Sequence, residues 1–367
     1  MSRGDGSRLC RPAEKVYNKL VGKVAHCHKE STMSPSFPVH RDRRADRREF
    51  LRLTAASAAV AGTSLLTRSA TSARAAASDS ETLVAQFYGS LTRQQKKQMA
   101  FPFDHPLRSK VNNNWMITDA VISKTFDADQ QALIREIFLK LHSEEYADKV
   151  LGQVEHDNRT ANRKGGFGGC SVAVFGEPGT GKFEFVFTGR HVTRRCDGDS
   201  VDGAAFGGPI FYGHAARGFN ERPDHPGNIY WYQALRANEL FAALDGKQRK
   251  LALRNDPRPE RETKTVELPG DGTELKGLPV SEMTADQKQL AHQVMADVLA
   301  PFRKVDVRES LKLIEKGGFE KLHFSYFQNM DIGNDRVWDV WQIEGPHMVW
   351  FFRGKPHVHT WVHIREP

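Results

Sequence analysis

Three histidines share one face of a predicted strand near the end of the chain. The segment His357–Ile364 reads HVHTWVHI, and side chains alternate between the two faces of a strand. One face therefore carries His357, His359, Trp361 and His363, while the other is apolar apart from one threonine. Imidazoles at positions i and i+2 have Cα atoms about 7 Å apart, close enough to bind one ion. A surface strand with solvated histidines is the alternative.

A metal site on this strand needs a further ligand from another part of the chain. Neutral imidazole suits zinc, copper or iron, so the other histidines are the first candidates. His191, at the end of a Phe-rich predicted strand, is the best of them, and His214, in the segment FYGH, is next. We expect His225 and His347 in loops or as hydrogen-bond partners instead.

A site with three histidines and an open position would activate water or dioxygen. Zinc would imply hydrolysis, whereas copper or iron would imply redox chemistry. Glu344 would supply an oxygen ligand or a general base, and Arg190 would hold an anionic group of an unidentified small-molecule substrate. The sequence has no nucleophile motif such as G-x-S-x-G. A protein that binds a metal or a small ligand without turnover, or a structural surface protein, is therefore the alternative to an enzyme.

The segment Gly176–Lys182 resembles a phosphate-binding loop but lacks two of its requirements. GEPGTGK fits the first seven positions of the P-loop pattern. The next residue is Phe183, where magnesium binding needs Ser or Thr. A P-loop also opens a helix, and FEFVF alternates as a strand. We predict a hairpin turn at this place and no nucleotide cofactor.

The patterning predicts the α+β class, with a helical N-terminal half of the mature chain packed on a mostly antiparallel sheet. No internal repeat is visible, and the charged, Pro- and Gly-rich segment Arg254–Lys276 is expected to be an exposed loop. Apolar residues at helical spacing predict helices at Gln130–Leu141, Tyr146–His156, Ile229–Leu244, Gln248–Leu253, Ala285–Phe302 and Val307–Lys316. Alternation predicts strands at Cys170–Phe175, Phe183–Val192, Lys321–Gln328, Val337–Glu344, His347–Arg353 and His357–Ile364.

An export signal precedes this domain. The segment Asp46–Arg52 reads DRREFLR, and the pair Arg47-Arg48 followed by Phe-Leu is typical of twin-arginine signals. The apolar stretch Leu53–Leu66 is shorter than the roughly 20 residues that a stable membrane span needs. Ala75–Ala77 provides a cleavage site. We therefore expect the twin-arginine translocase to deliver the folded protein to the periplasm or the exterior.

These features divide the chain into three segments. Residues 1–32 are a doubtful start or a disordered extension, because Met33 would give the signal an ordinary lead-in. Residues 33–77 form the signal peptide, and residues 78–367 form a single exported domain. Many proteins exported by this route acquire a cofactor in the cytoplasm, which favours a metal or redox centre.

Charge and cysteine content limit the partners further. Residues 1–77 contain 15 Lys+Arg and 6 Asp+Glu, a net charge of +9, so the rest of the chain has a net charge of −1. A nucleic-acid partner requires a basic surface, and the net charge of residues 78–367 does not support one. Two states are open for Cys170 and Cys196: two separate core thiols, or one disulfide in an oxidising compartment.

Short motifs in order along most of the mature chain resemble the family called domain of unknown function 3500 (DUF3500), a mostly bacterial family. The motifs are Phe175–Pro178 with the aromatic strand after it, Gly189–His191, Phe206–Pro209 with the following helix, Ile343–Pro346, and His357–Thr360. The resemblance implies that His191, His357 and His359 occupy matched positions. It favours their joint ligation of a metal, with a hydrogen-bonded histidine cluster around a non-metal ligand as the alternative.

Two positions depart from the family pattern. Arg190 stands where the family usually has a first histidine, and Val362-His363 stands where it usually has Trp-Arg. If these positions contact substrate, this chain differs from its relatives in substrate or in activity.

Overall fold

The computed structural model describes residues 79–160, 165–214, 227–331 and 337–367. All of them fall within one compact unit. The predicted signal with Arg47 and Arg48, the segment 1–32 and His225 lie outside the described residues. Among the described helices, none combines the length and the apolar character that crossing a membrane requires.

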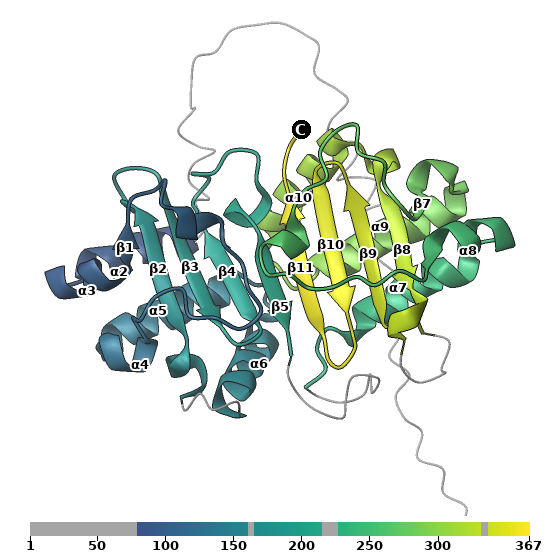
Figure 1. Cartoon of the computed structure of the whole chain (residues 1–367). Coiled ribbons are helices and arrows are strands. Elements are labelled where there is room, and N and C mark those ends of the chain that lie inside the picture. Colours follow the sequence, from purple (N-terminus) through teal and green to yellow (C-terminus); the bar gives the residue numbers. More distant parts are fainter. Residues whose placement is uncertain (1–78, 161–164, 215–226, 332–336) are drawn as a thin grey trace, which may run out of the picture. The chain divides into compact units, whose positions relative to one another are not determined.

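A mixed sheet forms the centre of the described chain (Figure 1). Its strands run in the order β1-β2-β3-β4-β5-β11-β10-β9-β8-β6, and β7 pairs with β8 beside this path. Neighbours are antiparallel except for the parallel pairs β1–β2 and β6–β8. The strands are β1 (Ala100–Phe101), β2 (Ser171–Gly176), β3 (Phe183–Gly189), β4 (Val192–Cys196), β5 (Ile210–Gly213), β6 (Leu253–Arg254), β7 (Leu278–Pro279), β8 (His323–Phe327), β9 (Val340–Gly345), β10 (Met348–Arg353) and β11 (His359–Ile364).

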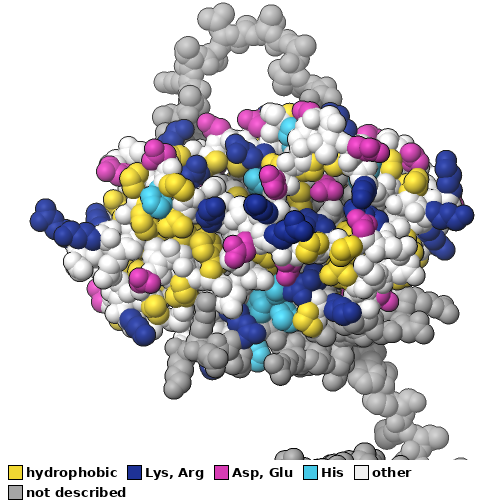
Figure 2. Space-filling model, viewed as in Figure 1, with side chains coloured by type: hydrophobic (Ala, Val, Ile, Leu, Met, Phe, Trp, Pro, Cys, Tyr) yellow, Lys and Arg dark blue, Asp and Glu magenta, His cyan; other side chains and the backbone are white. Residues whose placement is uncertain are grey.

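Helices cover one face of this sheet, behind it in Figure 1, and the face turned to the viewer carries several Lys and Arg side chains across its middle (Figure 2). The predicted helices and the α+β class are confirmed, although the boundaries differ by a few residues. The α-helices are α2 (Asp79–Ser90), α3 (Arg93–Met99), α4 (Ile122–Thr125), α5 (Ala128–Lys140), α6 (Ala147–Thr160), α7 (Trp231–Ala243), α8 (Gly246–Ala252), α9 (Ala285–Leu299) and α10 (Lys304–Gly317).

The same series of elements occurs twice, which corrects the expectation that the chain has no internal repeat. The first half runs α2-α3-β1-α4-α5-α6-β2-β3-β4-β5, and the second runs α7-α8-β6-β7-α9-α10-β8-β9-β10-β11, with a 3-10 turn at Val280–Glu282 in the place of α4. The strand order is palindromic about the β5–β11 pair. A pseudo-two-fold axis therefore passes between these two antiparallel strands.

Hydrogen bonds repeat along with the elements. Ile122 N donates to Cys170 O at 2.9 Å in the first half, and Val280 N donates to Leu322 O at 2.8 Å in the second. On the helical side, Ser143 N donates to Pro301 O and Arg303 N to Leu141 O, so each half reaches into the other in the same way. The repeat is seen in the order of the backbone elements and in a few polar contacts. The core side chains need not repeat, because apolar core positions accept many different side chains.

A pair of glutamines marks the corresponding place in each half. Gln95 and Gln130 each close a capping box at the start of a helix, and so do Gln248 and Gln287. The amides of Gln95 and Gln130 exchange hydrogen bonds, and those of Gln248 and Gln287 do the same at 2.8 Å in both directions. Each pair thus ties a short helix to the long helix packed beside it.

The core confirms the predicted alternation along β11. Val358, Val362 and Ile364 are buried in the large apolar cluster on the helical side of the sheet. Trp361 belongs to a second cluster on the opposite face, together with residues of β5 and β10. His359, two residues before Trp361, therefore points to the face that carries no helices.

Three local expectations meet different outcomes. The segment Gly176–Lys182 is the turn of the β2–β3 hairpin, closed by Glu177 N donating to Lys182 O at 3.1 Å, as predicted. Cys170 and Cys196 are separate buried thiols, which decides between the two states left open for them. Arg254–Lys276 is no plain exposed loop: it crosses the second face of the sheet, where Val266 is buried against Trp361 and its neighbours.

The glutamine pair of the second half gives a test of this packing. Replacing Gln248 by Ala removes the two hydrogen bonds that it exchanges with the buried amide of Gln287 and also its part in the α8 capping box. We expect a loss of about 1–3 kcal/mol in the free energy of unfolding, measured by urea denaturation. Gln289→Ala, on the exposed side of the same α9 helix, should change stability little. Equal losses in the two variants would contradict the proposed role of the pair.

Candidate metal centre

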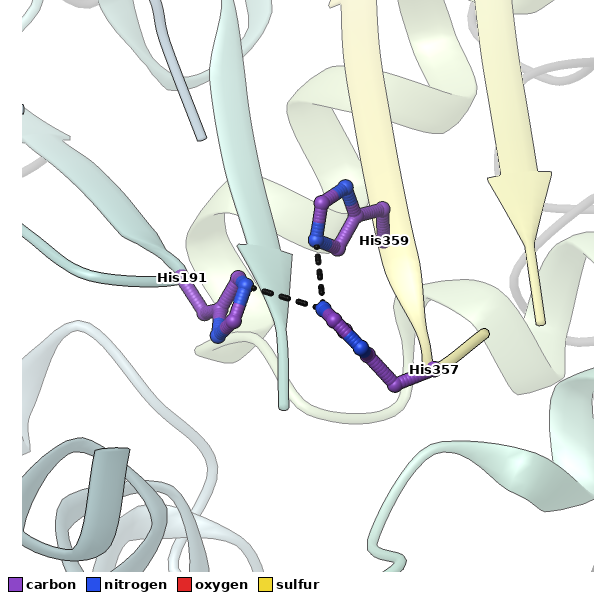
Figure 3. A group of neighbouring side chains, drawn as sticks. All are labelled: His191, His357 and His359. Atoms are coloured by element: carbon purple, nitrogen blue, oxygen red, sulfur yellow. Dashed lines mark hydrogen bonds between the residues drawn. The ribbon is translucent and has the colours of Figure 1, made fainter. Parts of the chain in front are cut away.

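His191 and the pair His357 and His359 come from distant parts of the sequence, and their rings converge on one point (Figure 3). The Nε2 atom of His357 lies 3.2 Å from Nε2 of His191 and 3.0 Å from Nε2 of His359. One nitrogen of each ring lies within 4.8 Å of the other two. His191 and His359 are buried and His357 is half-buried.

The sheet register brings His191 and His359 together across an intervening glycine. Val192 pairs with Tyr212, which pairs with Thr360, and Gly213 pairs with His359 in the adjacent row. The outer strands, β4 and β11, are two strand spacings apart, which is about 10 Å between Cα atoms. Gly213 leaves the space between them open, and the backbone is so close here that a Cβ at 213 would lie 2.1 Å from Val358 O.

His191 occupies the tight turn between β3 and β4 in a left-handed backbone conformation, with φ of 58°. Non-glycine residues held in this region cost of order 1–3 kcal/mol and cluster at functional sites. The conformation is fixed on two sides: His191 N donates to Asn113 O at 2.8 Å, and the Asp157 carboxylate contacts the ring. The strand predicted to extend to Val192 thus ends earlier, at Gly189.

Two carboxylates orient the outer imidazoles. Asp157, buried on α6, accepts a hydrogen bond from Nδ1 of His191 at 3.0 Å. Glu260 accepts one from Nδ1 of His359 at 2.8 Å. Because a carboxylate accepts only, Nδ1 of His191 carries the hydrogen and its Nε2 keeps its lone pair, whereas Nδ1 of His359 lies against both the Glu260 carboxylate and the Arg353 guanidinium. This carboxylate–histidine arrangement is the one that fixes the tautomer and raises the basicity of metal-ligating histidines.

Glu260 is itself held by groups of the last hairpin. Trp361 Nε1 donates to Glu260 Oε1 at 2.6 Å, and Arg353 Nε lies 3.2 Å from the same oxygen. Arg353 also contacts Nδ1 of His359. The negative charge beside His359 is therefore compensated by a guanidinium, which keeps the carboxylate in place.

All three imidazoles are neutral at neutral pH, the form in which they bind metals. Burial lowers the pKa of His191 and holds that of His359 well below the ordinary value. Burial, followed by the charges of His359 and His191, lowers the pKa of His357 to about 2. Protonating any one ring would place a positive charge against the other two, so the cluster favours either an uncharged state or a bound cation.

Two of the three separations between the nitrogens are close to those of a metal's ligands. Zinc–nitrogen bonds of about 2.0–2.1 Å at tetrahedral angles place two ligand nitrogens about 3.4 Å apart, and the Nε2 pairs at 3.0 and 3.2 Å are close to this value. His191 and His359 form the third pair, within 4.8 Å, so these two rings would have to turn toward one another to bind one ion. In the described part of the chain, no carboxylate or thiol joins the three nitrogens as a fourth group.

The remaining predicted site residues lie outside the cluster. His214 is fully buried after β5, where its Nε2 lies 2.8 Å from the side-chain oxygen of Asn228. His363, at the far end of β11, bonds Val266 O through Nδ1. Glu344 lies on β9, and burial raises the pKa of its carboxyl. Arg190 precedes His191 directly, and its charge helps to lower the pKa of His191 and His359.

Sequence reasoning missed the residues that support the cluster. Asp157 lies in a predicted helix with no motif around it, and Glu260 lies in the segment read as an exposed loop. Arg353 ends a predicted strand. Nothing local distinguishes these from ordinary surface charges, because their role depends on contacts between segments more than 30 residues apart. His347 bonds Asp271 at the surface, as expected.

Residues 73–366 match the family model described as Protein of unknown function (DUF3500). No curated protein and no solved structure matches the chain.

The supporting carboxylates give a test that spares the three histidines. Asp157→Asn and Glu260→Gln keep the shape of each side chain but remove the charge that orients the imidazole. We expect each to weaken zinc binding by about 10–100-fold, the usual effect of losing such a partner, measured by competition with a chelating dye. Glu267→Gln, an exposed residue of the same segment as Glu260, is the control and should leave the affinity unchanged. Equal affinities in all four proteins would exclude a role for these carboxylates.

Proposed function

The chain belongs to the DUF3500 family, and we propose that it is an exported metalloenzyme whose metal is held by His191, His357 and His359. One observation carries the proposal. Three neutral imidazole nitrogens converge in a mostly buried place, and two of the rings are oriented by carboxylates. Burying polar groups together in this way costs free energy. The binding of a ligand would offset that cost.

Three protein ligands favour catalysis over storage. Structural metal sites are closed by four protein ligands, whereas catalytic sites leave a position for water or substrate. A metal bound here would keep at least one position open with respect to the described residues. It would then lower the pKa of a bound water for hydrolysis, or bind dioxygen if the metal is copper or iron.

Arg190 is the residue we assign to substrate binding. It precedes His191 in the β3–β4 turn and is half-buried. Within the described part of the chain, its guanidinium forms no ion pair, whereas that of Arg353 is paired with Glu260. A planar guanidinium beside a metal suits an anionic substrate group, which it can bind through two parallel hydrogen bonds.

Elemental analysis tests the metal. The full-length chain, purified after folding in the cytoplasm, should contain about one equivalent of zinc, copper or iron. The double variant His357→Ala with His359→Ala should lose it, because a single remaining imidazole cannot hold the ion. His347→Ala is the matched control, since His347 occupies the corresponding turn of the second half, and this variant should retain the metal.

Two outcomes would contradict this assignment. Wild-type protein without stoichiometric metal would leave a hydrogen-bonded histidine cluster, and equal metal in the double variant would place the ion elsewhere. A spectroscopic signature of four protein ligands on the bound metal would favour a carrier without turnover.

Export is tested separately. We propose that the pair Arg47-Arg48 directs the folded, metal-loaded protein to the twin-arginine translocase and so to the periplasm or the exterior. Replacing both arginines by lysine keeps the charge but should leave the protein in the cytoplasm, as measured by fractionation and immunoblotting. Replacing Arg43 and Arg44 by lysine, a neighbouring arginine pair outside the motif, should not. Unchanged export of the first variant would exclude this route.

A further inference from the structure

The internal repeat predicts a counterpart of the metal centre at the opposite end of β5 and β11. The turn Gly189–Val192 of the first half corresponds to Gly345–Met348 of the second, and His347 stands in the place of His191. Tyr212 pairs with Val192 as Ile364 pairs with Met348. Five residues before Ile364 is His359, whereas five residues before Tyr212 is a glycine. The counterpart therefore lacks the ligands of the metal centre.

A cavity of about 520 Å³ is present at this second end. Its walls are the loop before β5, the segment 263–268 that crosses the sheet, and the end of β11, where His363 and Arg365 lie. His363 faces the same side of β11 as His359, four residues earlier. Gly207, which replaces the metal-ligating histidine in the repeat, contributes to the wall. The volume is in the range of small-molecule sites.

Positive charge dominates the polar part of this cavity. Lys264 and Arg365 line it, and neither forms an ion pair within the described part of the chain. Arg108 lines it as well, paired with the buried Glu184 at 3.1 Å. Glu267 is the acidic residue among the lining side chains. Two unpaired cations at the mouth of a cavity attract an anion.

The rest of the lining is apolar. Val201, Pro209, Val266 and Leu268 contribute to the wall from two different segments. Val266 and Leu268 belong to the apolar cluster that packs on this face of the sheet. A ligand that fills the cavity would thus need both an apolar body and a charged end.

We infer that this cavity binds a small organic carboxylate, with the carboxylate at Lys264 and Arg365 and the apolar body against Pro209 and Val266. Guanidinium and ammonium groups together match a carboxylate in charge and in hydrogen-bond geometry. The inference rests on the cavity and not on the proposed metal. The repeat has kept a binding site at each end of the β5–β11 pair, with a different chemistry at each.

Isothermal titration calorimetry with benzoate and hexanoate tests the assignment on the full-length protein. We expect saturable binding of at least one of them to the wild type. The double variant Lys264→Glu with Arg365→Glu, which changes two exposed side chains, should bind at least tenfold more weakly. Lys312→Glu, an exposed lysine of α10 away from the cavity, is the charge-matched control and should bind as the wild type does. Metal content should be equal in all three proteins.

Four results would overturn the inference. The first is no saturable binding of either carboxylate by the wild type. The second is equal affinity in the double variant, which would place the ligand elsewhere. The third is equal affinity for benzoate and for benzyl alcohol, its uncharged analogue, which would exclude recognition of the carboxylate. The fourth is binding of inorganic phosphate as tight as that of benzoate, which would exclude a role for the apolar wall.

Discussion

The antiparallel pairing of β5 with β11 is the contact on which the rest of the molecule depends. It joins the last strand of each half, with a register that runs from Gly213 opposite His359 to Ile210 opposite Val362. The pairing makes one continuous sheet from two repeated halves, so each half protects the strand edge that the other would expose. It also places the β3–β4 turn of the first half beside the start of β11. Without this register, His191 and His359 would belong to separate sheets.

The second constraint is the burial of polar groups on the face without helices. A segment of the second half crosses this face and delivers Glu260 to the last strand, while α6 of the first half delivers Asp157 from the other side. Asp157 is buried and Glu260 is half-buried, and each carboxylate has a partner, as buried charge requires. The imidazoles of His191 and His359 are therefore oriented by contacts within the fold, which is the condition for a selective metal site.

The two ends of the β5–β11 pair show how one architecture can support two chemistries. At one end histidines fill the space, and at the other a glycine replaces the ligand and a cavity with basic residues remains. The backbone order is the same in both halves, so the difference lies in a few side chains. Fold and function are separable in this molecule, as they are in repeat-built proteins generally.

The sequence by itself determined the local structure: the helices, most of the strands, the hairpin at Gly176–Lys182 and the face of β11 that carries the histidines. These follow from periodicity, which acts over a few residues. It also indicated His191 as the partner, from its place at the end of the Phe-rich strand and from the order of short motifs. The tertiary structure decided what depends on distant contacts: the two-fold repeat, the glycine between the rings, and the carboxylates Asp157 and Glu260. Those features arise from sheet register and from segment crossing, and no local pattern of side chains encodes either.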